Sequence, residues 1–187
     1  MNGTTLMINE SIFLRTTQLP REIVNRIEEL CYDLPWFYFD DCAIGKEAAE
    51  RQGLPLNPYF SHTLMRVDDQ AISEWYPKFP WTPIDAAARM LNNKRYRAHM
   101  TLQYPRPEAL NIPHNIHTDQ NFPHIVGLYY VNDTDGDTFF FDEDDNVVER
   151  VKPERGKMVV FDGKWRHSSS SPSEKVRFTL NINYENL

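Results

Sequence analysis

Two histidines and one aspartate in the second half of the chain have the residue types and spacing of metal ligands. His117 and Asp119 are two residues apart, and His167 follows fifty residues after His117. Side chains two apart on a β-strand point to the same side, so a histidine from a neighbouring strand can complete a triangle with them. Two histidines and one carboxylate form the facial triad that binds Fe(II) and leaves its opposite face open. We therefore predict that His117, Asp119 and His167 are both the metal ligands and the catalytic centre.

An arginine ten residues after His167 lies in a strongly alternating segment. Residues 176–184 place Arg177 and Thr179 on one face with two asparagines, whereas the other face is wholly apolar. This alternation predicts a β-strand with one buried face. A guanidinium pairs with a carboxylate in bidentate fashion, so Arg177, together with Thr179, is a candidate clamp for the carboxylate of a small molecule.

These motifs, taken in order, resemble the Fe(II)/2-oxoglutarate-dependent dioxygenase superfamily, and the chain is most similar to its prolyl 4-hydroxylase-like branch. The resemblance covers roughly residues 97–184, whereas the preceding 96 residues match no family in this way. Four further segments occur in the order typical of that branch: 103–105 (QYP), 127–132 (GLYYVN), 136–141 (GDTFFF) and 153–161 (PERGKMVVF).

The resemblance implies a reaction and a set of cofactors. Fe(II) and the co-substrate 2-oxoglutarate are implied, with O2 consumed, succinate and CO2 formed, and ascorbate supporting activity. The far carboxylate of 2-oxoglutarate is expected to pair with Arg177, helped by Thr179. Related halogenases carry a small residue at the position of Asp119, so the aspartate implies hydroxylation or a sibling oxidation.

Two tyrosines are candidates for further contacts with 2-oxoglutarate. By the same resemblance, Tyr104 ends the first core strand and Tyr130 ends an aromatic pair on the strand that follows the histidine–aspartate motif. Met100, four residues before Tyr104, is expected to share its face and to line the pocket. The alternative is that each tyrosine is a core aromatic with a satisfied hydroxyl. Tyr129 is expected to point the other way, into the core.

The pattern of apolar residues predicts an α+β fold that is mostly β. From Arg97 onward the apolar period is two, and eight short antiparallel strands in two facing sheets make a double-stranded β-helix, or jelly roll. The expected strands are 97–104, 114–118, 125–132, 137–142, 146–151, 157–161, 166–170 and 175–184. We expect one domain over 1–187, with 97–187 as the catalytic core.

Residues 1–96 are expected to form a helical and irregular region that supports the core. Its helices should pack on one sheet of the jelly roll. The expected elements are a first strand within 5–15 and helices at 20–32, 45–51, 70–76 and 83–95. Residues 33–61 otherwise read as irregular, with Trp36, Phe37, Tyr38 and Phe39 expected in the core. This segment and residues 106–116 are expected to shape the site of the prime substrate.

The composition of the chain limits which partners it can bind and in which cellular compartment it is expected. The chain has a net charge of −7, which argues against binding a polyanion through a basic face, so we expect no nucleic-acid partner. No apolar run approaches the ~20 residues of a spanning helix, and residues 1–17 lack the apolar stretch of a signal peptide. Cys31 and Cys42 are interpreted as reduced thiols. We expect a cytoplasmic protein without membrane contact, as a monomer or weak homodimer.

Three functions are compatible with these motifs. The first is an oxygenase that hydroxylates a peptidyl proline or a small molecule such as a free amino acid, with a slight preference for the peptide. The second is a jelly-roll module that binds metal or ligand without catalysis. The third is a nucleic-acid demethylase of the AlkB type, a group that carries a second arginine six residues after the first. That position is Asn183 here, which counts against the third reading.

Overall fold

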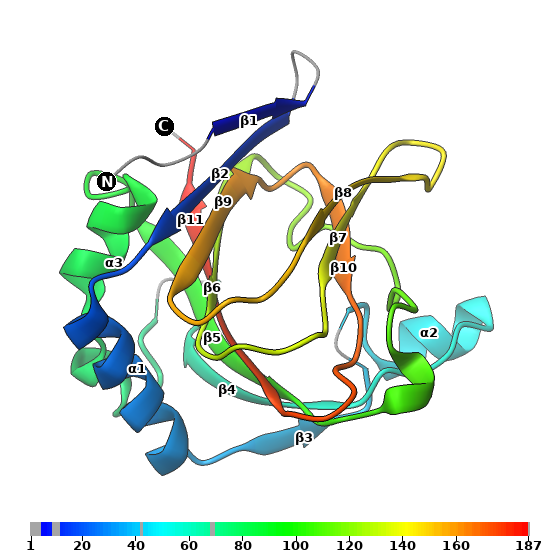
Figure 1. Ribbon diagram of the computed structural model, residues 1–187, viewed down its shortest axis with the longest axis horizontal. Coiled ribbons are helices and arrows are strands. Elements are labelled where there is room, and N and C mark those ends of the chain that lie inside the picture. The colour runs from blue at the N-terminus through cyan, green and yellow to red at the C-terminus, as the bar shows by residue number, and fades with distance from the viewer. Residues whose placement is uncertain (1–4, 9–11, 42, 68–69, 187) are drawn as a thin grey trace.

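Two antiparallel sheets face each other in the computed structural model, which describes residues 5–8, 12–41, 43–67 and 70–186 (Figure 1). The larger sheet has the strand order β1-β2-β9-β6-β11-β5-β4-β3, and the smaller has the order β10-β7-β8. The strands are β1 (Thr5–Ile8), β2 (Ile12–Gln18), β3 (Phe37–Phe39), β4 (Tyr59–Met65), β5 (Arg95–Gln103), β6 (His124–Tyr130), β7 (Thr138–Phe141), β8 (Val147–Val151), β9 (Lys157–Asp162), β10 (Arg166–Ser169) and β11 (Arg177–Glu185).

The predicted jelly roll is confirmed, and seven of the eight expected core strands are present. The exception is 114–118, where His117 makes only an isolated bridge to His167. The region before Arg95 also supplies four strands to the larger sheet. The strand expected within 5–15 corresponds to β1 and the start of β2, whereas β3 and β4 were not expected. Of the first expected strand, residues 9–11 lie outside the described residues.

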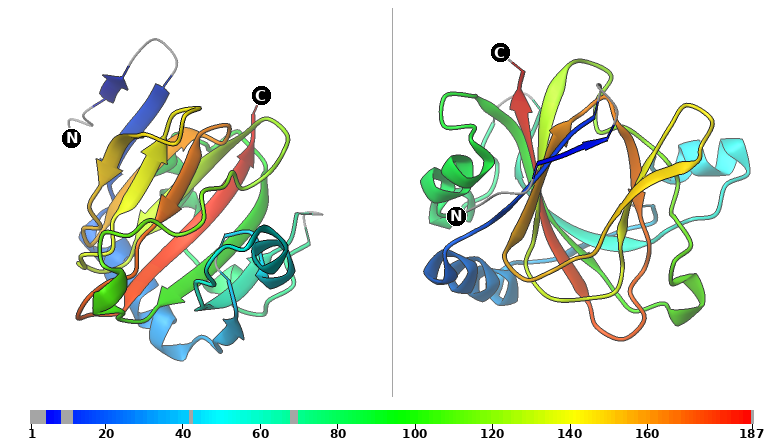
Figure 2. Two further views of the ribbon diagram at one scale, coloured as in Figure 1. Left: turned by 90° about the vertical axis from the view of Figure 1, so that its right-hand side faces the viewer. Right: turned by 45° about the horizontal axis from the view of Figure 1, so that its top comes forward.

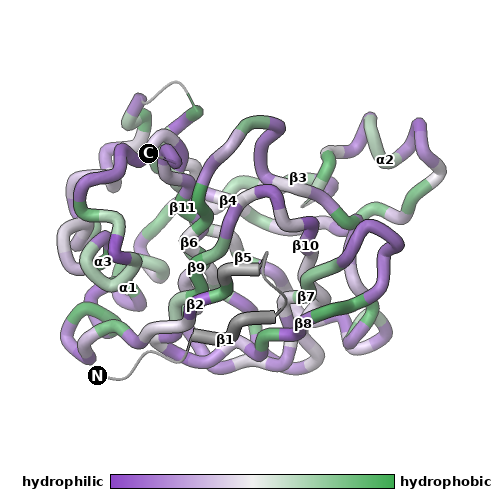
Figure 3. Tube along the Cα trace, turned by 90° about the horizontal axis from the view of Figure 1, so that it is seen from above, coloured by the Kyte–Doolittle hydropathy of each residue, from purple (hydrophilic) through white to green (hydrophobic). Residues whose placement is uncertain are grey.

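Helices α1 (Arg21–Asp33) and α3 (Trp81–Ala88) cover the outer face of the larger sheet, as expected of the N-terminal helices (Figure 2). Helix α1 follows Pro20 and buries Val24, Ile27 and Cys31, whose spacing places them on one helical face. Helix α2 (Lys46–Gln52) instead projects from the opposite side of the molecule (Figure 3).

Two helix predictions need correction. The helix expected at 70–76 is wrong, because Ala71 bridges Met65 of β4 and only a short 3-10 turn forms at Tyr76–Lys78. The helix expected at 83–95 begins earlier and ends at Ala88, where Arg89 adopts a left-handed conformation with φ 55°. Sheet pairing then takes over, since β5 already begins at Arg95.

The alternation of β11 separates an apolar layer from a polar interior. Its even residues Phe178, Leu180, Ile182 and Tyr184 belong to the core beneath α1 and α3. A fully buried side chain of this kind contributes about 1.5–3 kcal/mol. Tyr129 lies in the same core, as predicted. The odd residues of β11 face the space between the sheets, which is apolar beside β6 and β9 and polar beside β5 and β4.

The aromatic residues at 37–39 are not in the core. Phe37, Tyr38 and Phe39 are 58%, 56% and 45% exposed, so the expectation that they are buried is wrong. They form β3, which is the last strand of the larger sheet. An edge strand is covered less than a central strand, so its side chains stay exposed. Only Trp36 packs inward, with its ring 5.6 Å from that of Phe178.

The described part of the chain bears on two further expectations. Cys31 is a buried free thiol, as expected of a reduced cysteine. Burial raises the pKa of this thiol to about 12. Cys42 lies outside the described residues. None of the described helices is long and apolar enough to cross a bilayer. The cytoplasmic location stays a prediction.

Candidate metal centre and co-substrate cavity

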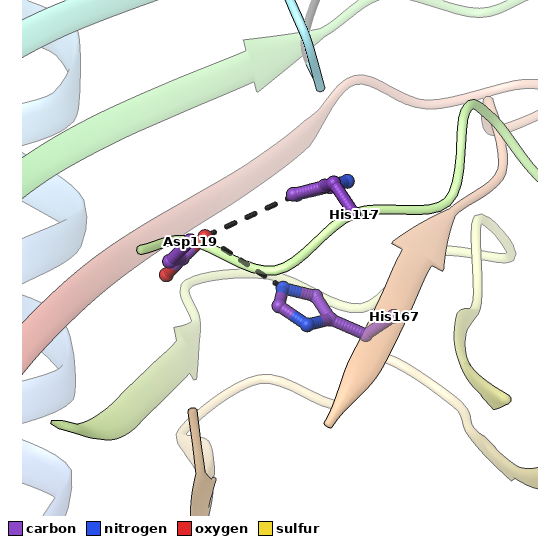
Figure 4. Close-up of side chains that lie close together, drawn as sticks. All are labelled: His117, Asp119 and His167. Atoms are coloured by element: carbon purple, nitrogen blue, oxygen red, sulfur yellow. Dashed lines mark ion pairs between the residues drawn. The ribbon is translucent and has the colours of Figure 1, made fainter. Parts of the chain in front are cut away.

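The three predicted ligands converge between the sheets (Figure 4). His117 and His167 pair through both backbone amides, at 3.1 and 2.9 Å, which brings their rings to within 4.7 Å. Asp119 Oδ1 lies 3.9 Å from His117 Nε2 and 3.7 Å from His167 Nε2. One ligand atom from each residue therefore faces a common point, as a facial triad requires.

Hydrogen bonds fix which nitrogen each histidine presents. His117 Nδ1 donates to the carbonyl of Asn115 at 3.0 Å, and His167 Nδ1 donates to the carbonyl of Trp165 at 2.9 Å. A carbonyl only accepts, so both protons sit on Nδ1 and both Nε2 lone pairs point toward the centre. Burial, followed by the neighbouring His167, lowers the pKa of His117 to about 4. At neutral pH His117 is therefore uncharged, the form that metal ligation needs.

The outer oxygen of Asp119 is held by side chains of β11 and β5. Asn181 and Asn183 donate to Asp119 Oδ2 at 3.0 and 2.7 Å. Arg97 donates to Asn183 at 3.0 Å and lies 3.7 Å from the same oxygen. Burial alone raises the pKa of Asp119, but the groups around it, His167 first and then the charge of Arg97, hold that pKa well below its usual range. The carboxylate is thus ionised, with Oδ1 left facing the histidines.

A ladder of polar pairs joins the inner faces of β5 and β11. Hydrogen bonds between side chains occur at three of its four rungs. We call this set the inner ladder; its rungs are Arg97–Asn183, His99–Asn181, Thr101–Thr179 and Gln103–Arg177. The first two rungs lie at Asp119, and the last two lie around Arg177. The same two strands therefore build both parts of the cavity.

Arg177 is buried deep in this cavity, 3% exposed. Its guanidinium donates to Gln103 Oε1 at 3.2 Å and to Thr138 Oγ1 at 2.9 Å. Tyr130 lies beside it, with the guanidinium 5.5 Å from the ring, and donates its hydroxyl to the same Thr138 oxygen at 2.8 Å. A buried cation of this kind attracts a carboxylate strongly. The expected position of Tyr130 next to the clamp is what the structure shows; its contact with 2-oxoglutarate stays a prediction.

The phase of β5 differs from the expected one. Arg97, His99, Thr101 and Gln103 line the cavity, whereas Met100 is fully buried in the core beneath the helices. The expectation that Met100 lines the pocket is therefore wrong. Tyr104 follows the end of β5, with its ring 6.4 Å from Phe60, and is not among the described residues that line the cavity. Gln103 contacts Arg177 in its place.

Two histidines that the sequence did not single out also line the cavity. Burial, followed by the charge of Arg177, lowers the pKa of His114 to about 3, and Ser171 lies 3.0 Å from its Nε2. Burial, followed by Arg97, lowers the pKa of His99 to about 3 as well. The signal that could have placed His99 was the run of polar residues at alternate positions of β5.

Comparison with known proteins gives the fold a name. No family model and no curated protein matches the chain. Among solved structures, it is similar to a 2OG-Fe(II) oxygenase family oxidoreductase from Burkholderia pseudomallei, with TM-score 0.63, 13% identity, and coverage of 91% of this chain and 84% of that one. It is also similar to a Pseudomonas putida prolyl-4-hydroxylase, with TM-score 0.54, 14% identity, and coverage of 94% and 93%.

A third similar structure has a different described activity. The α-ketoglutarate-dependent epimerase SnoN from nogalamycin biosynthesis has TM-score 0.61 and 14% identity, covering 92% of this chain and 77% of that one. Identities this low establish the fold alone. The chain thus has the jelly-roll fold of the Fe(II)- and 2-oxoglutarate-dependent oxygenases, a fold on which several reactions occur.

Proposed function

We propose that the chain is an Fe(II)- and 2-oxoglutarate-dependent oxygenase that hydroxylates a peptidyl proline or a small molecule such as an amino acid. One observation carries this proposal: a two-histidine, one-carboxylate cluster and a buried arginine line the same cavity. The cluster suits a divalent cation, and the arginine suits the far carboxylate of a dicarboxylic acid. The oxygenase fold supports the same reading without deciding the substrate.

The residues in and beside the cavity have different proposed roles. His117, Asp119 and His167 would hold iron, which supplies the activation of O2 when bound. Arg177, with Thr179 and Tyr130 beside it, would pair with the far carboxylate of 2-oxoglutarate. Phe140 and Phe161 pack with their rings 4.9 Å apart, and these rings lie 6.2 and 5.0 Å from that of His167, so one side of this proposed ligand is apolar.

The role of Asn183 argues against the demethylase alternative. AlkB-type enzymes carry an arginine at this position, whereas the amide here donates to Asp119. The net charge of −7 also disfavours a polyanionic substrate. A non-catalytic module is not favoured by any observation, because both the triad and the arginine are in place.

A coupled assay tests the proposal. The purified protein, supplied with Fe(II), 2-oxoglutarate, O2 and ascorbate, should form succinate, and a correct prime substrate should increase that rate. Proline-containing peptides, free amino acids and other small acids form the screen. Failure to form succinate under all these conditions, with iron bound, would contradict the proposal and favour the non-catalytic module.

A further inference from the structure

Arg97 and His99, which are successive residues on the inner face of β5, line the metal cavity with unused hydrogen-bonding capacity. A guanidinium carries five N–H donors. Among the described residues, the one hydrogen bond from the Arg97 side chain runs from Nη1 to Asn183 at 3.0 Å, so Nε and Nη2 remain able to donate. Nδ1 of His99 is buried and has no hydrogen-bond partner in the described part of the chain.

A buried imidazole nitrogen without a partner needs an explanation. Most buried polar atoms of side chains have a hydrogen-bond partner, and leaving one without costs about 1–3 kcal/mol. His99 does not lie in apolar packing, because Arg97 and Thr101 flank it on the same face of β5 and Asn181 is opposite on β11. An unpartnered polar atom in the wall of a polar cavity indicates a contact with a ligand.

The two residues lie at the opposite end of the inner ladder from Arg177. Arg97 and His99 form its first two rungs with the asparagines of β11, whereas Arg177 belongs to the fourth rung. The proposed position of 2-oxoglutarate, from the metal to Arg177, therefore extends away from Arg97. This leaves the first two rungs available to the prime substrate.

Arg97 also lines a second pocket, which opens to solvent. This pocket has a volume of about 490 Å³, and its described lining residues are Thr63, Met65, Arg66, Val67 and Arg97. A small molecule that enters here meets a guanidinium that lies 3.7 Å from Oδ2 of Asp119. The second pocket therefore gives access to the metal centre from the Arg97 end of the ladder.

The charges in the loaded cavity favour one further anion. Among the described residues, the arginines and the carboxylate that line the cavity are Arg97, Arg177 and Asp119. Bound Fe(II) and dianionic 2-oxoglutarate would cancel each other, and Asp119 would cancel one arginine, so one positive charge would remain. A guanidinium matches the two oxygens of a carboxylate, which would neutralise this charge. The net charge of −7 disfavours a polyanion in the same place.

We propose that Arg97 and His99 form a subsite for the carboxylate of the prime substrate, which is a small carboxylic acid such as a free amino acid. This inference rests on the proposed oxygenase function and narrows its substrate class. A proline within a peptide chain has no free carboxylate, so the subsite selects against a peptidyl substrate.

Pairs of probes that differ only in charge test the subsite on the Mn(II)- and 2-oxoglutarate-loaded protein. Calorimetry compares free L-amino acids and N-acetyl-L-amino acids with the corresponding carboxamides. At least one acid should bind, and its carboxamide should bind at least ~10-fold more weakly, which corresponds to about 1.4 kcal/mol. This comparison uses the wild-type chain, so it does not depend on the folding of any variant.

Substitutions at saturating Mn(II) locate the effect. His99→Phe keeps a planar ring but removes both nitrogens, and Arg97→Gln removes the charge, so each should weaken the binding of that acid at least ~10-fold. Arg97→Lys should recover part of the loss, because it restores the charge without the planar fork. Arg66→Gln is the matched control, since Arg66 lines the second pocket but is not among the residues that line the metal cavity. It should change binding less than ~2-fold, because solvent and salt screen an exposed charge.

Five results would overturn the inference. These are no binding of any probe acid, equal binding of acid and carboxamide, unchanged acid binding in both His99→Phe and Arg97→Gln, an equal loss in Arg66→Gln, and a loss of 2-oxoglutarate affinity instead of acid affinity. The last result would assign the two residues to the co-substrate. If 2-oxoglutarate fails to bind the wild-type Mn(II) protein, the proposed function itself fails.

Discussion

The two ends of the inner ladder lie on the same pair of strands but present opposite charges. At one end, Asn181, Asn183 and Arg97 surround the ionised carboxylate of Asp119. At the other, Gln103 and Thr138 accept hydrogen bonds from the guanidinium of Arg177. The first end attracts a cation, and the second attracts an anion. A molecule that coordinates a metal with one end and carries a carboxylate at the other matches this arrangement.

The contrast also predicts that metal binding and 2-oxoglutarate binding can be lost separately, by substitutions at different ends of the ladder. Substitutions at the Asp119 end should weaken metal binding and leave the affinity for 2-oxoglutarate at saturating metal nearly unchanged. Substitutions at the Arg177 end should do the reverse, since Arg177 is held by Gln103 and Thr138 and not by the histidine pair. Such a split would be absent if the cavity were only a structural polar core.

The largest effect is expected from removing a ligand. His167→Ala deletes one of three donors, so Fe(II) affinity should fall by more than the ~10–100-fold typical of losing an outer-shell partner. The fold should persist, because the site sits within a packed jelly roll. Anaerobic competition titration with a metal indicator measures the affinity, and circular dichroism controls for folding. Unchanged Fe(II) affinity would remove His167 from the metal site.

A second large loss, confined to the other end, is expected at Arg177. Arg177→Ala removes one partner of a buried charge pair, which typically costs ~2–5 kcal/mol, or roughly thirtyfold to several-thousandfold in affinity for 2-oxoglutarate. Arg177→Lys keeps the charge but loses the planar fork, so its affinity should lie between those of the wild type and Arg177→Ala. Mn(II) affinity should stay constant across the three proteins. Equal 2-oxoglutarate affinity in all of them would place the anchor elsewhere.

The sequence predicted those parts of the site that depend on local alternation. Residues 176–184 alternate so regularly that the inward position of Arg177 and the outward position of Leu180 follow from it. On β5 the same signal was present in the alternation of Arg97, His99 and Thr101. The expectation instead took its phase from Tyr104, which lies past the end of the strand, and so turned Met100 inward by mistake.

Other features depend on pairings that no local pattern contains. Phe37 and Phe39 read as core residues because they are apolar, and only the sheet order shows that β3 is an edge. The hydrogen bonds that Asn181 and Asn183 donate to Asp119 join residues that are 62 and 64 positions apart in the sequence. The convergence of His117, Asp119 and His167, by contrast, was predictable because these residue types are rare in combination at this spacing.

An intermediate effect on metal binding is expected from the asparagine that holds Asp119. Asn183→Ala leaves all three ligands in place but removes the shorter of the two hydrogen bonds to the outer oxygen of Asp119, so metal affinity should fall ~10–100-fold. Thr179→Val, on the same face of β11 but at the Arg177 end, is the matched control. It should leave metal affinity unchanged and weaken the binding of 2-oxoglutarate by only about 0.5–1.5 kcal/mol, the contribution of one hydrogen bond. Matching losses of metal affinity in both variants would contradict the separation of the two ends.

The smallest effect concerns stability and pH. The pKa of His114 is lowered to about 3 in the folded protein, below the ~6.5 of an unfolded chain. Stability associated with this neutral ring is present above about pH 6.5 and is lost as the pH falls toward 3. His114→Gln should therefore flatten the pH dependence of the unfolding free energy in that window, by at most ~1.4 kcal/mol per pH unit. Urea unfolding at several pH values measures both slopes, and identical slopes would contradict the assignment.

The most direct test of the proposed cavity is whether the two ends of the inner ladder bind one molecule together. Calorimetry of 2-oxoglutarate on the wild-type protein, with Mn(II) present and then with the metal removed, measures this. Binding should be tight with Mn(II) and much weaker without it, because the ligand needs both the metal and Arg177. Equal binding in the two states would show that the carboxylate site works without the metal centre, and no binding in either state would show that this cavity does not hold 2-oxoglutarate.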